Sequence, residues 1–113
     1  MIINILKEIN SNAATGINDG KKIFNVTNRA LKDGKNVILD FKKIKFISPT
    51  FLNIAIGRLY GIYEKSFLSS NLKVVHMNNN DLIMLNRVIK NANEYIDKLA
   101  KEYLDRFMNW LSG

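Results

Sequence analysis

The residues best suited to chemistry are two hydroxyl side chains, Ser48 and Thr50, on either side of Pro49. Ser48 is a favourable helix N-cap, because its side-chain oxygen can accept a hydrogen bond from a free helix N–H. Pro49 then occupies the first helical position, where its missing N–H costs nothing. Thr50 falls in the first turn, where free N–H groups and the helix dipole favour negative charge. The pattern predicts a helix start at which phosphorylation of Thr50, with Ser48 as second candidate, changes the surface that a partner meets.

The surroundings of Thr50 leave two interpretations open. A first-turn threonine can also serve only to cap or pack the helix. Phe51, directly beside it, is bulky enough to shield the hydroxyl or obstruct a kinase. The turn before this helix carries Lys42, Lys43 and Lys45. These lysines form either an ordinary solvated turn or a basic rim that binds an acidic partner surface or a phosphate.

Few other groups in the chain suit catalysis. Asp40 ends an apolar strand, but no second carboxylate, histidine or nucleophile is placed in the sequence to cooperate with it. We therefore expect Asp40 to be solvated or to form a turn, and His76, the only histidine, to be structural. Cysteine is absent, which excludes thiol catalysis and cysteine metal sites. Since a glycine-rich phosphate cradle is also missing, the sequence predicts a protein that is not an enzyme and uses no metal or cofactor.

Residues 46–58 resemble the motif of STAS domains, the fold of the anti-sigma-factor antagonists. In that family a hydrophobic strand ends in an acidic residue, and Phe-x-Asp-Ser-Ser-Gly-Leu-Gly opens the next helix. In this chain Ser48 stands where the family has Asp, and Thr50 stands where it has the phosphorylated Ser. The resemblance extends to Leu52 and the Gly57-Arg58 pair, and it departs at Pro49 and Phe51.

The chain resembles more closely a divergent STAS-like family of unknown function. Members of that family show Ser-Pro-x-Phe-Leu-Asn-x-Ala-Ile-Gly-x-Leu-Tyr-Gly, which corresponds to Ser48 through Gly61 here. They also show Val-Ile-x-Asn-Ala-x-x-Tyr, which corresponds to Val88 through Tyr95. The similarity covers roughly residues 18–95.

The resemblance implies a regulatory protein-binding module in the manner of an anti-sigma-factor antagonist. Its partner would be a histidine-kinase-like ATPase that acts as a serine/threonine kinase, and phosphorylation of Thr50 would break the complex by repulsion and desolvation. The expected docking surface comprises a strand end, the basic turn and the start of the next helix: Asp40, Lys42, Lys43, Lys45, Ser48, Pro49, Thr50, Phe51 and Asn53.

Strands and helices alternate along the chain, which predicts an α/β domain of STAS-like architecture. We expect a mixed sheet of about four strands with right-handed crossover helices packed on it, and an added C-terminal amphipathic helix. Strands are expected at Met1–Leu6, Asn36–Phe41 and Leu72–Met77, and helices at about 18–33, 48–66 and from the 78–81 turn to Lys90. Residues 7–17 lack a clear period and are interpreted as a loop that could contain a further short strand.

Local signals refine these elements. Asn18 or Asp19 can cap the first crossover helix, and Gly34 can end it. The continuous apolar run at 36–41 is typical of a central strand covered on both faces. Gly57 and Gly61 lie on one side of the next helix, which predicts a close helix–sheet approach.

Residues 93–111 form the most clearly amphipathic stretch of the chain. Its wide apolar stripe comprises Ile96, Leu99, Ala100, Tyr103, Leu104, Phe107, Trp110 and Leu111. The opposite side carries charges of both signs, which argues against an anchor to anionic membranes. The helix either docks on its own sheet or forms a dimer or partner interface, for which Tyr103, Phe107 and Trp110 are the candidate residues.

The composition of 113 residues with 47% hydrophobic content fits one domain, 1–113, with 93–111 as a helical extension. The net charge is +7, but the lysines are dispersed without interleaved aromatics, so a nucleic-acid accessory role is the least favoured function. A constitutive scaffold or dimerisation module without a switch is the main alternative. No apolar run approaches the roughly 20 residues that span a bilayer. The first residues suit a strand better than a signal peptide, so we expect a cytoplasmic protein, with a bacterial composition rich in Asn, Ile and Lys.

Overall fold

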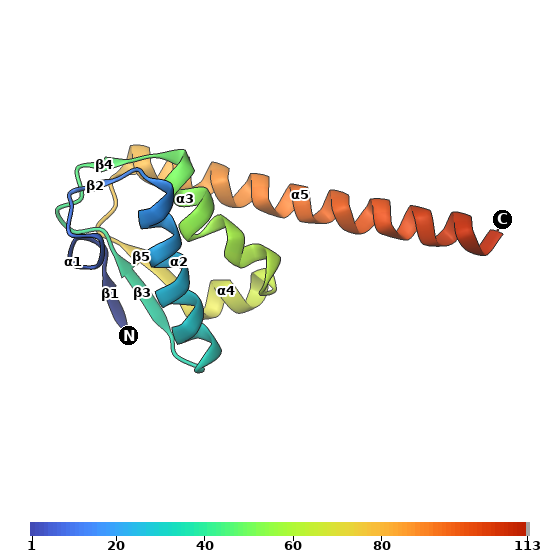
Figure 1. Ribbon diagram of the computed structural model, residues 1–113, viewed down its shortest axis with the longest axis horizontal. Helices are drawn as coiled ribbons and strands as arrows, with labels where there is room; N and C mark the ends of the chain where they lie inside the picture. Colours follow the sequence, from blue (N-terminus) through green and yellow to red (C-terminus); the bar gives the residue numbers. More distant parts are fainter. Residues whose placement is uncertain (113) are drawn as a thin grey trace.

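The computed structural model describes residues 1–112 and contains two small parallel sheets (Figure 1). β1 (Ile2–Asn4), β3 (Val37–Asp40) and β5 (Leu72–Val75) form a three-stranded sheet in the order β1-β3-β5. β2 (Ala13–Ala14) and β4 (Phe46–Ile47) form a separate two-stranded sheet. The α/β class expected from the sequence is confirmed. The expectation of one mixed sheet of about four strands is wrong, because the strands divide into sheets of three and two.

The first strand is shorter than expected because Asn4 begins a helix. Its side-chain oxygen accepts a hydrogen bond of 2.9 Å from the N–H of Lys7, which caps α1 (Ile5–Ile9). Asn10 ends α1 with a φ of 53°, a left-handed conformation that asparagine tolerates better than most residues. The expected loop at 7–17 therefore contains part of a helix as well as the short strand β2 that the sequence allowed.

α2 (Ile17–Lys32) ends at the glycine that the sequence indicated. Gly34 has a φ of 78°, and its N–H and that of the next residue donate back to carbonyl groups of the last helical turn. This is the Schellman arrangement, in which a left-handed glycine ends a helix. At the other end the N-cap is Gly16, without a side-chain hydrogen bond, so the expected capping by Asn18 or Asp19 is wrong.

The three-stranded sheet has one well-buried face. Burial alternates along β3, where Val37 and Leu39 are buried and Ile38 is only half-buried. The parallel register places Ile38 between Ile2 and Lys73, which are both exposed. The expectation that the central strand is covered on both faces is therefore wrong. The core lies on the other face and is built mainly from Ile3, Ile23, Leu31, Val37, Leu39, Phe41, Phe51, Leu52, Ile56, Leu59 and Leu68.

The region expected as one long helix over 48–66 contains two short helices and the start of a third. They are α3 (Pro49–Ala55), the 3-10 helix η1 (Gly57–Gly61) and α4 (Lys65–Asn71). The first division coincides with Gly57, where an added Cβ would lie 3.4 Å from the side chain of Val88 on the last helix. Gly57 thus permits an approach between helices instead of the expected helix–sheet approach. Gly61 serves neither purpose, because a Cβ there would meet nothing within 4 Å.

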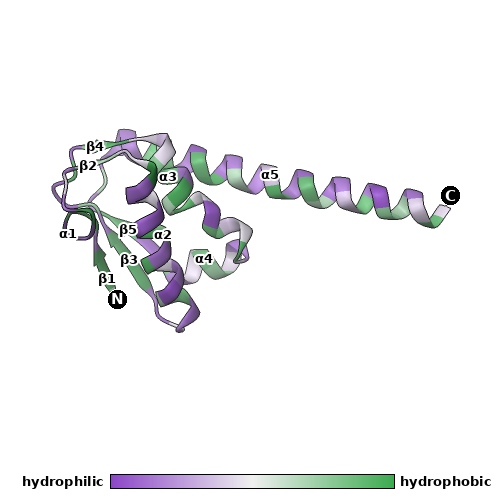
Figure 2. Cartoon of the chain, in the orientation of Figure 1, coloured by the Kyte–Doolittle hydropathy of each residue, from purple (hydrophilic) through white to green (hydrophobic). Residues whose placement is uncertain are grey.

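α5 (Asn79–Ser112) is one continuous helix, although the sequence was interpreted as two. No glycine or proline interrupts it, so nothing ends the first segment near Lys90. Its first half packs on α3 and η1, with Leu85 and Val88 buried. Beyond Ile96 every described residue is exposed, and the helix projects from the domain with apolar and polar bands along its length (Figure 2). The expectation that this helix docks on its own sheet is wrong.

Candidate functional site

Ser48 caps α3, as the sequence predicts. Its hydroxyl oxygen accepts a hydrogen bond of 3.0 Å from the N–H of Phe51, and the hydroxyl donates one of 2.9 Å to the carbonyl of Thr15. The second bond joins residues 33 apart in the chain and ties the start of α3 to the loop after β2. Pro49 occupies the first helical position, where it gives up no helical hydrogen bond. The donor and acceptor functions of Ser48 are therefore both occupied by the fold.

Thr50 lies on the exposed side of the first turn of α3. No side-chain hydrogen bond holds its hydroxyl among the described residues, in contrast to that of Ser48. Phe51 lies on the other side of the helix, where it is fully buried and contacts Phe41 edge-on with ring centroids 6.4 Å apart. Phe51 is thus a core residue. We expected Phe51 to belong to the docking surface and to shield the Thr50 hydroxyl, and both expectations are wrong.

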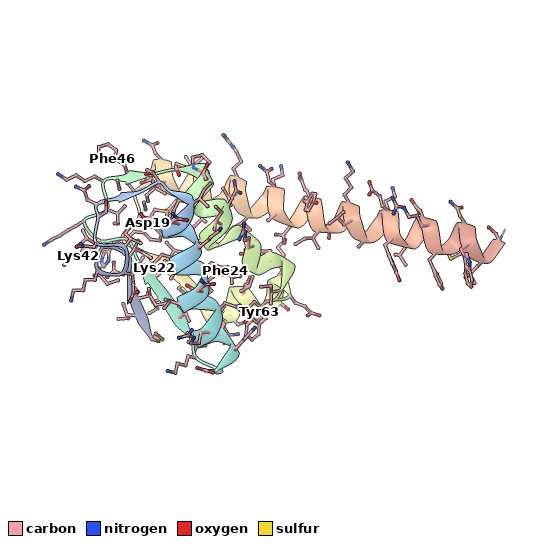
Figure 3. The ribbon with its side chains drawn as sticks, in the orientation of Figure 1. Asp19, Lys22, Phe24, Lys42, Phe46 and Tyr63 are labelled. Carbon is pink, nitrogen blue, oxygen red and sulfur yellow. The ribbon has the colours of Figure 1, made fainter. Side chains whose placement is uncertain are left out.

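The basic turn before the helix is exposed throughout. Lys42, Lys43 and Lys45 all face solvent, and the N–H of Lys45 donates a hydrogen bond of 2.8 Å to the carbonyl of Asn12. Phe46 follows and is 63% exposed despite its large apolar side chain (Figure 3). The sequence reasoning missed Phe46, because a strand of two residues is too short to show which side chain points outward.

Most of the expected docking residues are exposed along one continuous segment of the chain, which we call the edge surface. It follows the connection from β3 to β4 and the start of α3, and comprises Lys42, Lys43, Lys45, Phe46, Pro49 and Thr50. Asn53 is also exposed but lines a groove with α5. The edge surface therefore combines three positive charges, one apolar side chain and one unbonded hydroxyl.

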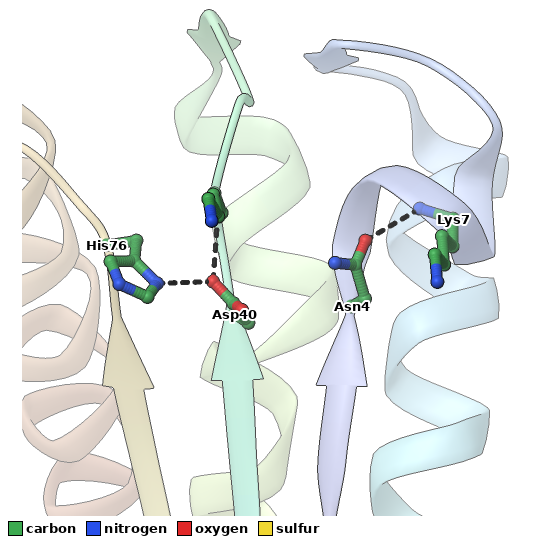
Figure 4. A network of polar contacts seen from close by, with 5 residues as sticks. Asn4, Lys7, Asp40 and His76 are labelled. Carbon is green, nitrogen blue, oxygen red and sulfur yellow. Dashed lines mark hydrogen bonds and ion pairs between the residues drawn. The ribbon is translucent and has the colours of Figure 1, made fainter.

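Asp40 and His76 form a pair where β3 and β5 end (Figure 4). The Nδ1 atom of His76 lies 2.7 Å from Oδ1 of Asp40, and the N–H of Lys42 donates to the same oxygen at 2.9 Å. The hydrogen bond from His76 is the main cause that lowers the pKa of Asp40; desolvation opposes it, and the N–H of Lys42 adds to it. Asp40 forms a turn, as expected. The expectation that no histidine is placed to cooperate with Asp40 is wrong, because parallel pairing brings residues 36 apart to the same edge.

The chemistry open to this pair follows from its hydrogen bonds. A carboxylate can only accept, so Nδ1 of His76 carries the proton, and the imidazole side chain is 59% exposed. No hydroxyl or amine side chain is hydrogen-bonded to His76 among the described residues. Within the same part of the chain, no group of three or more His, Cys, Asp or Glu side chains could hold a metal ion. What the pair visibly does is fix the turn at Lys42 and the end of β5 relative to each other.

The candidate interface residues of the C-terminal helix are all exposed. Tyr103, Phe107 and Trp110 are 72%, 46% and 75% exposed, and the rings of Phe107 and Trp110 stack with centroids 6.3 Å apart. They lie on the projecting half of α5, far from Lys42 and Phe46 of the edge surface (Figure 3). None of the described helices is long and apolar enough to cross a membrane.

A comparison with protein families supports the resemblance found in the sequence. The family model described as a STAS-like domain of unknown function matches residues 19–82, which is more than half of the chain. This match includes the motif at 48–61, whereas the second motif at 88–95 lies outside it. Neither the curated proteins nor the solved structures contain a significant match.

Proposed function

Because this chain belongs to the STAS-like family of unknown function, we propose that it is a regulatory protein-binding module whose partner docks on the edge surface. The observation that carries the proposal is the 63% exposure of Phe46, four residues before the exposed and unbonded hydroxyl of Thr50. Large aromatic side chains are the usual anchors of protein interfaces. The three lysines of the edge surface would attract an acidic partner and speed its association.

The switch in this proposal is phosphorylation of Thr50. A kinase can reach the exposed hydroxyl without breaking a hydrogen bond of the fold. A phosphate adds about 1.5 to 2 negative charges at neutral pH. Those charges would offset the lysines of the edge surface and repel an acidic partner. Ser48 is the poorer acceptor, because its modification would remove the cap of α3 and the bond to Thr15.

The partner that we propose is a histidine-kinase-like ATPase that also acts as the kinase, by resemblance to the anti-sigma-factor antagonists. In this scheme the domain itself catalyses no reaction. Asp40 and His76 act as positioning residues, since Asp40 accepts the N–H of Lys42 and thereby fixes the basic turn.

The first test is affinity capture from the native cell's lysate with the wild-type domain and with Thr50→Val and Thr50→Glu. The valine keeps the branched shape but cannot be phosphorylated. We expect wild type and Thr50→Val to capture the same ATPase, and added ATP to release it only from wild type, with phosphate appearing on Thr50 by mass spectrometry. Thr50→Glu should capture little of it. An ATP-indifferent partner and an unmodified Thr50 would reduce the function to a constitutive scaffold.

A second test separates the edge surface from general charge. Replacing Lys42, Lys43 and Lys45 by Glu should abolish capture. A control with the same change in net charge carries Glu at Arg29, Lys32 and Lys35, exposed positions near the far end of α2. Equal loss of binding in both variants would show that the partner responds to net charge and would contradict docking at the edge surface.

A further inference from the structure

We propose that the projecting half of α5 pairs antiparallel with the same segment of a second copy of this chain. The proposal concerns a surface separate from the edge surface and does not depend on the proposed function. It starts from one apolar stripe that runs the length of α5 at steps of three or four residues: Leu85, Ile89, Ala92, Ile96, Leu99, Tyr103, Phe107 and Trp110. The first half of this stripe is covered by the domain, and the second half is exposed.

The exposed half of the stripe offers enough apolar area for a stable pair. Tyr103, Trp110 and Leu99 of the stripe are 72%, 75% and 47% exposed. Leu104 and Leu111, which lie at the edge of the stripe, are each 58% exposed and widen the apolar surface. An aromatic side chain buries up to about 200 Å², so three aromatics and three leucines would contribute roughly 600 Å² from each copy. Both copies together reach the lower end of the range for specific interfaces, about 1,200 to 2,000 Å².

The charges of this half suit a copy of itself better than a strongly charged partner. Residues 97–112 carry three acidic side chains and three basic ones, so the segment is neutral although the chain has a net charge of +7. Nucleic acid and anionic lipid would each favour a basic helix. A self-complementary surface needs opposite charges that meet across a two-fold axis.

The helices that pack on the first half of α5 exclude parallel pairing. On the first half of α5 the stripe faces α3 and η1 of its own copy. A parallel neighbour on the same stripe would have to occupy the space of those helices. An antiparallel neighbour enters from the free end instead, and overlaps only the exposed half.

One pair of charges sets the register. Glu102 and Arg106 lie one turn apart on the same flank of the stripe. We place the two-fold axis of the pair perpendicular to the helices, at the height of Leu104. Glu102 of one copy then faces Arg106 of the other, and the same contact forms a second time by symmetry. A parallel pair brings no such opposite charges together on this flank.

In the same register Trp110 of one copy packs against a groove on the other copy. The register brings Trp110 of one copy within one residue of the level of Leu99 of the other, next to an open groove of about 480 Å³. The groove is lined largely by apolar atoms and includes Gly57, Gly61, Tyr95 and Leu99. The indole would thus close the gap where α5 leaves the domain of the second copy.

The test uses two charge variants of the whole chain, Glu102→Arg and Arg106→Glu. In an antiparallel pair, each variant alone sets like charges against each other twice, which should weaken self-association roughly tenfold. Mixed together, the variants restore both opposite-charge contacts between copies, so native mass spectrometry should show mainly the mixed dimer. Repulsion within each helix persists in the mixture and therefore cannot explain the recovery.

The matched control is the pair Asp105→Arg and Lys98→Glu, which change the same kinds of charge on the opposite side of the helix. Their mixture should show no preference for the mixed dimer. Trp110 is the only tryptophan of the chain, so its emission should shift to shorter wavelength as wild-type concentration rises. Trp110→Ala should lose the dimer in sedimentation but have the same thermal midpoint as wild type at a concentration low enough for both to be monomers.

Two results would overturn the proposal. One is a wild-type chain that sediments as a monomer up to its solubility limit. The other is a wild-type dimer whose two charge variants show no preference for each other when mixed, since that dimer must use another surface or direction. Neither result bears on partner capture by the edge surface, so this proposal and the proposed function can fail separately.

Discussion

Replacing Ser48 by alanine tests whether Ser48 is the structural hydroxyl of the site and Thr50 the one that the fold does not need. The change removes both the bond of 3.0 Å accepted from Phe51 and the bond of 2.9 Å donated to Thr15. Loss of an N-cap typically costs about 1 kcal/mol. Loss of a second, long-range hydrogen bond costs about 1 kcal/mol more. We therefore expect Ser48→Ala to lower the free energy of unfolding by about 2 kcal/mol.

Thr50→Ala provides the matched control, because it removes a hydroxyl two residues away that makes no hydrogen bond in the described chain. An exposed substitution of this kind should change the free energy of unfolding by less than about 0.5 kcal/mol. Ser48→Thr should recover most of the loss, since threonine can cap and the extended backbone at this position, with φ of −107° and ψ of 155°, suits it.

Urea denaturation followed by far-UV circular dichroism measures these differences as shifts of the midpoint at constant slope. The measurement has to be made at a concentration where every variant has the same oligomeric state. Equal stability of Ser48→Ala and wild type would refute the reasoning, because the cap and the tie to the β2 loop would then contribute nothing. A loss in Thr50→Ala as large as that in Ser48→Ala would show that Thr50 is structural and would count against a switch there.

The remaining predictions concern the core and the edge of the sheet. Gly20→Ala should lower stability by about 1 to 2 kcal/mol, because the added Cβ would lie 3.0 Å from a side chain of α3; Gly61→Ala, with nothing within 4 Å, should not do so in the same urea titration. Thr27→Val should raise the free energy of unfolding by about 1 kcal/mol, since its buried Oγ1 has no hydrogen-bond partner among the described residues. The folded-state pKa of Asp40 is lowered, so its stabilising effect is present above the ordinary pKa and is lost as the pH falls through the lowered one. His76→Ala should raise the pKa of Asp40 in a carboxyl-carbon NMR titration and flatten the acid limb of the stability curve.

The parts of the site that depend on a single helical turn were predictable from the sequence. The cap at Ser48 and the helix start at Pro49 need only the residues that follow them. The burial of Phe51 was not predictable in this way, because it depends on which side of α3 meets the core. The contact between Asp40 and His76 could not be predicted from the sequence either, because it requires knowledge of the pairing and register of β3 with β5.

The fold shows the same division between local and long-range causes. Gly34 ends α2 as predicted, because a left-handed glycine acts within the last turn of a helix. The division of the sheet into two parts has no local signal, since β2 and β4 are two residues long and exist only through their pairing. The continuity of α5 could have been predicted, because 91–93 contains neither glycine nor proline.

The pairing of α5 would also change how the edge surface binds. With the two-fold axis beside Leu104, the two points at which the helices leave their domains, near Ile96, are roughly 24 Å apart along the helix axis. In each domain Lys42 and Phe46 of the edge surface lie on the side away from the projecting helix, so this part of both edge surfaces stays open to a partner (Figure 3). A partner with two sites would then bind with higher apparent affinity than a partner with one site. Trp110→Ala should therefore weaken capture of a dimeric partner and leave binding of a monomeric fragment unchanged. Loss of both would mean that α5 belongs to the docking surface itself.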